Sequence, residues 1–232
     1  MPGDIDIAPV AAVLADPTRA NILIALSDGQ SLPAGELAWR ARVKASTASA
    51  HLAKLVDSGL LVVVKQGRHR YFRLADPRII QAIETLASFA PAAPVRSLRE
   101  SAAAEAVRAA RMCYNHLAGR LGVSLSEALV NKGILDSFDE GYIITDGGKQ
   151  WMQGFGIDSA NFKKQRSLLV PCHIDWSERR HHAAGAFGAA LTKHLLDLKW
   201  IEHLPSSRAV RLTETGRQGL KSEFDLDFQK GS

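Results

Sequence analysis

The chain has 232 residues, which is enough for two domains with their own hydrophobic cores. Its 46% hydrophobic and 23% charged residues are ordinary for a soluble globular protein, and no apolar run approaches the roughly 18 residues that cross a bilayer. The two cysteines, Cys113 and Cys172, lie far apart in sequence, which excludes a disulfide framework, and no secretion signal is apparent. We therefore expect a cytoplasmic protein.

Basic residues are concentrated in one segment. The net charge is +5, but the stretch from Arg40 to Arg73 holds eight Lys and Arg residues opposed only by Asp57, a local charge of +7. The rest of the chain is therefore slightly acidic. Such clustering indicates a face that binds nucleic acid, because attraction to phosphates supplies much of the affinity for DNA.

The first elements in chain order are helices. A helical pattern over Ile7–Leu26 is interrupted at Asp16-Pro17, where Asp16 suits an N-cap and Pro17 a first helical residue. Two short helices are then expected, over Glu36–Arg42 and Ser46–Leu55. Two short helices joined by a tight turn are the helix-turn-helix pattern.

A hairpin is expected next. Leu60–Lys65 and Arg70–Leu74 read as strands, and the turn between them is Gly-containing and basic. Helix, turn, helix and basic hairpin together predict a winged helix with DNA as its partner.

Three separated motifs resemble the ArsR/SmtB family of bacterial repressors. They are Leu14–Arg19 with Ile22-Leu23, Ser46–Leu61 and Gly67–Leu74, so the similarity covers roughly residues 8–90. The resemblance implies a homodimeric winged helix that represses transcription and leaves its operator DNA when an inducer appears. Two kinds of metal site well known in that family are not present here, because Gly35–Arg40 has no cysteine and Pro77–Ala90 has no histidine.

The recognition helix and the wing supply the candidate DNA contacts. Hydroxyl and basic side chains there suit base edges or phosphates, without giving a base assignment. The predicted DNA-binding residues are Arg40, Arg42, Lys44, Ser46, Thr47, Ser49, His51, Lys54, Gln66, Arg68, His69 and Arg70.

A domain boundary is expected near residue 91. The helix over Pro77–Ala90 has a broad apolar stripe, which the resemblance assigns to dimerisation, and the stiff Pro91–Val95 stretch after it suits a linker. We expect residues 1–91 to be the DNA-binding and dimerisation domain. Residues 92–232 would be a sensor or effector domain.

The second half begins with an expected long helix over Arg96–Leu121, and a further helix is expected to start at Ser124 or Ser126. Leu129–Leu135 and Leu195–Ile201 then resemble Leu55–Leu61.

A predicted hairpin follows each of these two segments, and then a helix that starts at a Thr-x-x-Gly sequence, at Thr145 and at Thr213. The predicted fold class is mainly α with small β wings (α+β). It comprises a winged helix-turn-helix domain and a C-terminal domain of divergent winged-helix-like units whose wings are not basic.

Two segments in the second half carry ligand-binding residue types, Arg111–His116 and Pro171–His182. The second resembles a Cys-x-x-Asp-Trp-Ser-Glu-Arg-Arg-x-His-x-x-Gly segment of longer members of the same family, a resemblance that names no ligand. The candidate effector-binding residues are Cys113, Tyr114, His116, Cys172, His173, Asp175, Trp176, Arg179 and His181.

Three chemistries fit these residues. Cys113 and His116 would share a face of the expected helix and, with Cys172 and His173 or His181, would bind a soft metal or metalloid ion. Cys113 and Cys172 would alternatively be redox-active thiols beside Arg and His. An organic ligand would instead use Tyr114, Trp176, His116 and Arg179 as pocket walls.

A purely structural interpretation also stands. Buried cysteines are usually inert, and Asp175 with Glu178 fits the capped start of a helix that runs to Leu198. Gly185 and Gly188, among alanines, indicate a very close helix contact.

An enzyme is not expected. Cys172, His173 and Asp175 have the types of a nucleophile, a base and an orienting residue, but no oxyanion or cofactor motif accompanies them. The sequence predicts a DNA-binding transcriptional regulator, a homodimeric repressor that a metal or small-molecule effector releases from operator DNA, with no membrane partner. The alternative is a DNA-binding assembly protein without a small-molecule signal.

Overall fold

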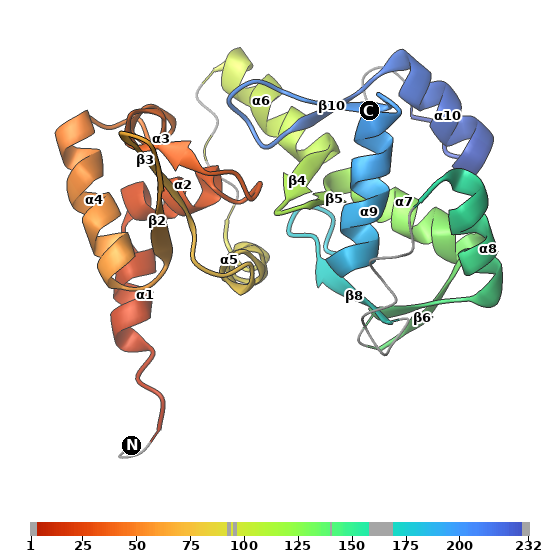
Figure 1. The fold of residues 1–232 in the computed structure, drawn as a ribbon, viewed down its shortest axis with the longest axis horizontal. Coiled ribbons are helices and arrows are strands. Elements are labelled where there is room, and N and C mark those ends of the chain that lie inside the picture. Colours follow the sequence, from red (N-terminus) through yellow and green to blue (C-terminus); the bar gives the residue numbers. More distant parts are fainter. Residues whose placement is uncertain (1–3, 92–93, 95–96, 140, 158–168, 229–232) are drawn as a thin grey trace. The chain divides into compact units, whose positions relative to one another are not determined.

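The computed structural model describes residues 4–91, 94, 97–139, 141–157 and 169–228 (Figure 1). The chain forms two compact units, Met1–Ile83 and Glu84–Ser232. The division lies inside helix α5 (Arg78–Ala87), whereas the boundary predicted from the sequence follows residue 91. Within the predicted linker, residues 92, 93 and 95 lie outside the described residues.

The first unit is a winged helix, as predicted. Its helices are α1 (Ala8–Leu14), α2 (Pro17–Ala25), α3 (Ala34–Arg40) and α4 (Ala45–Asp57), and its strands are β1 (Leu32–Pro33), β2 (Leu61–Gln66) and β3 (His69–Leu74). The strands form an antiparallel sheet in the order β1-β3-β2, and α5 follows β3. The fold class predicted for this half is therefore confirmed.

Local signals in the sequence account for these elements. The Asp16 carboxylate accepts a hydrogen bond from the Arg19 N–H at 3.0 Å, so Asp16 caps α2 as expected. Gly67 has a φ of +59°, which lets a two-residue turn connect β2 to β3. Helix α4 buries Ala48, Leu52 and Leu55, so its opposite face stays at the surface.

The second unit contains two copies of one arrangement. The first copy is β4 (Arg111–Cys113), β5 (His116–Ala118), α7 (Gly119–Asn131), β6 (Leu135–Phe138), β7 (Gly141–Ile144) and α8 (Asp146–Phe155). The second copy is β8 (Leu169–Ile174), β9 (His181–Ala183), α9 (Gly185–Asp197), β10 (Ile201–His203), β11 (Val210–Leu212) and α10 (Glu214–Phe224). Helix α6 (Leu98–Ala109) precedes the first copy.

The two copies exchange strands. Hairpin β6-β7 pairs with β8-β9 in one sheet, in the order β6-β7-β8-β9. In the same way Ala209, the residue before β11, forms an antiparallel bridge with Arg111 of β4. The two pairings have the same register. Gly141 and Pro171, which pair in the four-stranded sheet, occupy the positions in the repeat that correspond to Ala209 and Arg111.

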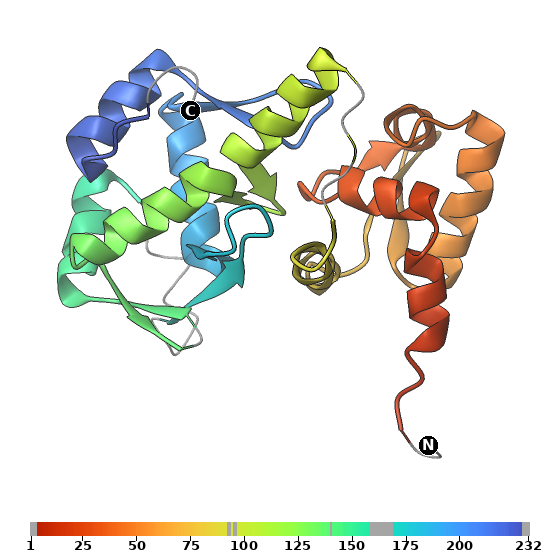
Figure 2. The same ribbon diagram turned by 180° about the vertical axis from the view of Figure 1, so that it is seen from behind.

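The predicted repeat is thus present, with its hairpins and helix starts. The hydroxyl of Thr145 accepts a hydrogen bond from the Gly148 N–H, and that of Thr213 accepts one from the Gly216 N–H, so both threonines cap their helices. Figure 2 shows α8 and α10 side by side, where the Trp151 and Phe224 rings meet at 5.7 Å.

The single long helix predicted over Arg96–Leu121 is wrong. Helix α6 ends at Ala109, and hairpin β4-β5 follows it. The hairpin is favoured over a continued helix because its backbone hydrogen-bonds to the second copy of the repeat. The Met112 N–H donates to the Arg208 carbonyl oxygen at 2.8 Å. Helix α7 then starts at Gly119, not at Ser124 or Ser126.

The predicted helix from Asp175 to Leu198 is also too long. Its first residues form a turn and strand β9, and α9 starts only at Gly185. Gly188 makes the close contact that the sequence indicates, because a Cβ there would lie 2.5 Å from the Ala183 carbonyl oxygen. No helix among the described residues is long and apolar enough to cross a membrane.

Candidate functional site: a basic helix face and a buried Cys/His cluster

Most of the predicted DNA-binding side chains of the first unit lie on its surface. Helix α4 exposes hydroxyl and basic groups because its apolar residues face the core, and the hairpin β2-β3 exposes its basic tip. The exposed predicted residues are Arg42, Lys44, Ser46, Thr47, Ser49, Lys54, Gln66, Arg68, His69 and Arg70. These groups together form a surface suited to a polyanion.

Two of the predicted DNA-binding residues make internal contacts instead. The Arg40 guanidinium pairs with Glu36 at 2.6 Å and also donates to the Ala25 carbonyl oxygen, which leaves its side chain 10% exposed. The His51 ring lies 3.5 Å from the Asp16 carboxylate at the start of α2 and is 18% exposed. Arg40 is the last residue of α3 and His51 lies in the middle of α4, and these contacts direct both side chains inward.

Four potential metal ligands converge in the second unit. The ligand atoms of Cys113, His116, His173 and His182 all lie within 4.8 Å of one another. Cys113, His116 and His182 are buried and His173 is half-buried. The Cys113 sulfur lies 4.0 Å from the Nδ1 of His173, and the His116 ring lies 4.9 Å from that of His173 and 5.2 Å from that of His182.

The repeat explains why these residues meet. Cys113 and His116 are cross-strand partners in β4-β5, and His173 and His182 are cross-strand partners in β8-β9. Each copy thus contributes two equivalent positions. Sequence analysis missed His182, although the sequence His-x-Ala-Gly-x-x-Gly occurs twice, at 116–122 and at 182–188. That internal repeat was the signal that would have found it.

Other candidate residues lie away from the cluster. Cys172 is adjacent to His173 in strand β8, so its side chain points to the opposite face, where it packs against the hydrophobic core. His181 and Arg179 are exposed. Tyr114 lies in the two-residue turn between β4 and β5, with a φ of +61°. The structure thus brings His182, and not Cys172, together with the other three residues of the predicted metal set.

The helical argument for Cys113 and His116 is wrong as well. The two residues do not share a helix face but face each other across a hairpin. Cys172 and His173 are neighbours in strand β8, so their side chains point to opposite faces of the strand. They do not face each other as a nucleophile and its base would.

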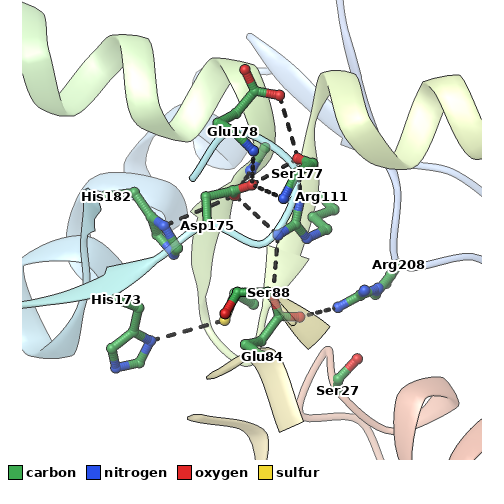
Figure 3. A network of polar contacts seen from close by, with 12 residues as sticks. Ser27, Glu84, Ser88, Arg111, His173, Asp175, Ser177, Glu178, His182 and Arg208 are labelled. Atoms are coloured by element: carbon green, nitrogen blue, oxygen red, sulfur yellow. Dashed lines mark hydrogen bonds and ion pairs between the residues drawn. The ribbon is translucent and has the colours of Figure 1, made fainter. Parts of the chain in front are cut away.

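Asp175 and Arg111 link the cluster to helix α5 (Figure 3). The Arg111 guanidinium has no exposed surface, and its Nη2 lies 2.9 Å from Asp175 and 3.0 Å from Glu84. Glu84 also binds Arg208 at 2.5 Å. The Nδ1 of His182 lies 4.0 Å from the Asp175 oxygen that binds Arg111.

Asp175 is held by more than the ion pair. Its carboxylate accepts hydrogen bonds from the backbone N–H groups of Gly119 at 2.6 Å, Ser177 at 2.9 Å and Glu178 at 3.0 Å. Trp176 lies over Arg111, with its ring centroid 4.7 Å from the guanidinium carbon. Asp175 thus makes the capping hydrogen bonds that the sequence predicts, but they stabilise a turn and not the start of a helix.

Burial favours the neutral form of the His116 and His182 imidazoles and the protonated form of the Cys113 and Cys172 thiols. Burial lowers the pKa of His182 to about 4 and holds the pKa of His116 well below its usual range. Burial, together with Glu84, raises the pKa of Cys113 to about 12, and burial also raises the pKa of Cys172. Because the thiolate is the reactive form, neither cysteine is activated as a redox thiol in this state.

The carboxylates behave in the opposite way. Burial alone would raise the pKa of Asp175, but Arg111 and the hydrogen bonds from Ser177, Gly119 and Glu178 outweigh it and lower the pKa to about 2. Burial opposes ionisation of Glu84 too, yet Arg208 and Arg111 lower its pKa. Both carboxylates are therefore ionised around Arg111.

Comparison with known proteins relates both halves to regulators. Residues 14–64 match a family described as a helix-turn-helix domain. The uncharacterized HTH-type transcriptional regulator YdfF of Bacillus subtilis (strain 168) is 43% identical over 221 residues, which covers 95% of this chain and 98% of the relative.

Shorter relatives match part of the chain. The HTH-type transcriptional regulator CmtR of Mycobacterium bovis is 40% identical over 80 residues, 34% of this chain and 67% of the relative. Among solved structures, the cadmium metal-sensor CmtR of Mycobacterium tuberculosis matches with 35% identity and a TM-score of 0.32, covering 40% of this chain and 99% of that one.

The relative that spans nearly the whole chain decides the family, and the winged helix of the first unit agrees with it. The protein described here accordingly belongs to the helix-turn-helix transcriptional regulators of the ArsR/SmtB family and is a DNA-binding regulator of transcription.

Proposed function

We propose that this protein is a homodimeric repressor that binds operator DNA through α4 and the β2-β3 wing, and that an effector bound in the second unit releases it. The observation that carries the DNA-binding part is the exposed basic set on one unit. Lys44, Lys54, Arg68 and Arg70 are exposed there, in a segment whose only acidic residue is Asp57. A dimer would present two α4 helices to successive major grooves.

The effector part is supported by the second unit. It holds a buried group of ligand-type side chains that neither DNA contact nor core packing explains. Release requires that the effector bind one dimer shape more tightly than the other, because a ligand shifts an equilibrium only by its differential affinity. The shape that binds the effector would space the two α4 helices poorly for DNA.

The test of DNA binding starts from a pool of random duplexes, from which the wild-type protein selects its site. Affinity for that site is then measured by fluorescence anisotropy across a salt series. Arg68→Ala with Arg70→Ala is expected to weaken binding at least tenfold and to lower the slope of log K against log salt by about 2, because two phosphate contacts are lost.

Arg211→Ala is the matched control. Arg211 is an exposed arginine of hairpin β10-β11 in the second unit, paired with Glu202 at 2.6 Å. Its removal is expected to leave both affinity and salt slope unchanged. Equal losses in the wing variant and the control, or no loss in either, would remove the wing from the DNA-binding surface.

A further inference from the structure

The Cys/His cluster contains buried polar atoms whose hydrogen-bonding capacity is unused. Among the described residues, nothing hydrogen-bonds to the Nε2 of His116 or to either ring nitrogen of His182. These two side chains are 2% and 1% exposed, so solvent does not replace the missing partners. An unpaired buried polar atom is costly. One nitrogen of each of these two rings lies within 4.8 Å of the Cys113 sulfur and of a His173 nitrogen, so one bound ligand could satisfy both rings.

We propose that Cys113, His116, His173 and His182 bind one divalent d-block metal ion of the zinc class in tetrahedral geometry, and that this ion is the effector of the regulator. The second part rests on the proposed function, whereas the first does not. The site is built from two cross-strand pairs, one from each copy of the repeat.

The ligand types select the ion. Three imidazoles and one thiolate suit zinc, cobalt and their neighbours, whereas magnesium and calcium require oxygen ligands, and no carboxylate belongs to the cluster. Ligand atoms around a tetrahedral zinc lie roughly 3.3–3.8 Å apart, as its bond lengths of about 2.0–2.3 Å require. The present spread of up to 4.8 Å needs only a small contraction of side chains.

Binding is a proton exchange at Cys113. The ion takes the place of the thiol proton, which leaves to solvent, and the neutral imidazoles bind through lone pairs without losing a proton. Four protein ligands close the coordination sphere, so the site suits binding and not hydrolysis at a metal-bound water.

A second set of residues connects the site to α5. A metal-bound histidine commonly donates its other ring N–H to a carboxylate, and the Asp175 carboxylate lies 4.0 Å from the Nδ1 of His182. Asp175 binds Arg111, and Arg111 binds Glu84, which is the first residue of the second unit and lies on α5. Contraction around the ion would therefore pull on Asp175 and act on the helix in which the two units join. Asp175 is a positioning residue in this scheme.

The metal-binding test uses full-length protein freed of metal by a chelator and titrated with Co²⁺. We expect one ion per chain, with the intense visible bands of tetrahedral cobalt and a thiolate-to-cobalt charge-transfer band in the near ultraviolet. Cys113→Ser should remove the charge-transfer band, and Cys172→Ser, the matched control, should keep it. Persistence of the band in Cys113→Ser, or its loss in Cys172→Ser, would overturn the assignment.

A second measurement needs no variant. X-ray absorption of the zinc-loaded wild-type protein should show one sulfur ligand at about 2.3 Å and three nitrogen ligands at about 2.0 Å. No sulfur, or two sulfurs, would contradict the site. This keeps the proposal testable if substitution of a buried ligand prevents folding.

Coupling to DNA separates the two claims. Selected operator DNA is titrated with metal-free protein, zinc-loaded protein and zinc-loaded Cys113→Ser. We expect zinc to weaken wild-type binding between 5-fold and 150-fold, the usual range of allosteric coupling, and to leave the variant unaffected. Metal uptake with unchanged DNA affinity would overturn the effector role, and DNA binding in none of the samples would overturn the proposed function while the cobalt spectrum still decides the site.

Discussion

Arg111 has no exposed side-chain surface, yet it lies between two carboxylates, and this arrangement sets the electrostatics of the second unit. A buried ion of this kind is stable only if its partners and hydrogen bonds compensate for the water it loses. Here the partners belong to distant parts of the chain, Glu84 on α5 and Asp175 after β8. Removing one partner therefore leaves a buried charge poorly paired.

Glu84→Gln tests this residue. At pH 7 we expect a loss of about 3 kcal/mol in the free energy of unfolding of the second unit, because Arg111 and Arg208 both lose a charged partner. The pKa of Glu84 is lowered in the folded state, so its stabilisation is present above its unfolded value of 4.5 and is lost as the pH falls through the folded value. The difference between wild type and variant should therefore shrink below pH 4.5.

Urea unfolding followed by tryptophan fluorescence measures the difference in free energy of unfolding between wild type and Glu84→Gln. A Trp39→Phe background confines the signal to the second unit, which holds the other three tryptophans. Glu202→Gln is the control, since Glu202 forms an exposed pair with Arg211 and should cost less than about 1 kcal/mol. A difference that stays constant from pH 7 to well below 4.5 would refute the assigned role of the Glu84 charge.

Sequence reasoning predicted three of the four residues that the structure brings together in the cluster. Cys113, His116 and His173 were among the expected metal ligands, whereas Cys172 was expected and His182 was not. The reason is the periodicity assumed for each segment. In a strand, neighbours such as Cys172 and His173 point to opposite faces, and partners such as His173 and His182 point to the same face.

At the scale of elements, the close approach of β9 to α9 holds the cluster together. A Cβ at Gly188 would lie 2.5 Å from the Ala183 carbonyl oxygen and 3.1 Å from the Cβ of His116, so this glycine lets both hairpins approach. Gly122 holds the equivalent place in the first copy, where a Cβ would lie 2.5 Å from the Leu117 carbonyl oxygen. Close backbone packing therefore requires glycine at the last position of both His-x-Ala-Gly-x-x-Gly sequences.

Gly188→Ala is expected to lower the free energy of unfolding of the second unit by about 1–3 kcal/mol, because backbone must move to admit the methyl group. The same substitution at Gly154 is the control. Gly154 lies in α8 with nothing within 4 Å of a Cβ, so Gly154→Ala should stabilise by about 0.5–1 kcal/mol. Urea unfolding of both variants decides the matter, and a neutral Gly188→Ala would contradict the close packing.

The elements of the first unit were predictable because their signals are local. Asp16-Pro17 starts α2, and Gly67 marks the wing turn. Hairpin β4-β5 was not predictable in this way. The alanine-rich sequence before it favours a helix, and its pairing with Arg208 to Val210 depends on residues nearly a hundred positions away. Long-range pairing overrides local propensity there.

At the scale of the whole molecule, the winged-helix unit is followed along the chain by a unit that holds the buried Cys/His cluster. The repeat within Glu84–Ser232 supplies all four residues of that cluster. In the proposed function, an effector bound in this second unit controls DNA binding by the first unit.

The most direct test is a titration of free zinc, buffered by a chelator, into the wild-type protein bound to its selected operator duplex, with fluorescence anisotropy as the readout. We expect the DNA to dissociate at a protein concentration where the metal-free protein stays bound, with an apparent affinity 5-fold to 150-fold weaker at zinc saturation. Binding curves that coincide with and without zinc, or zinc that tightens binding, would contradict it.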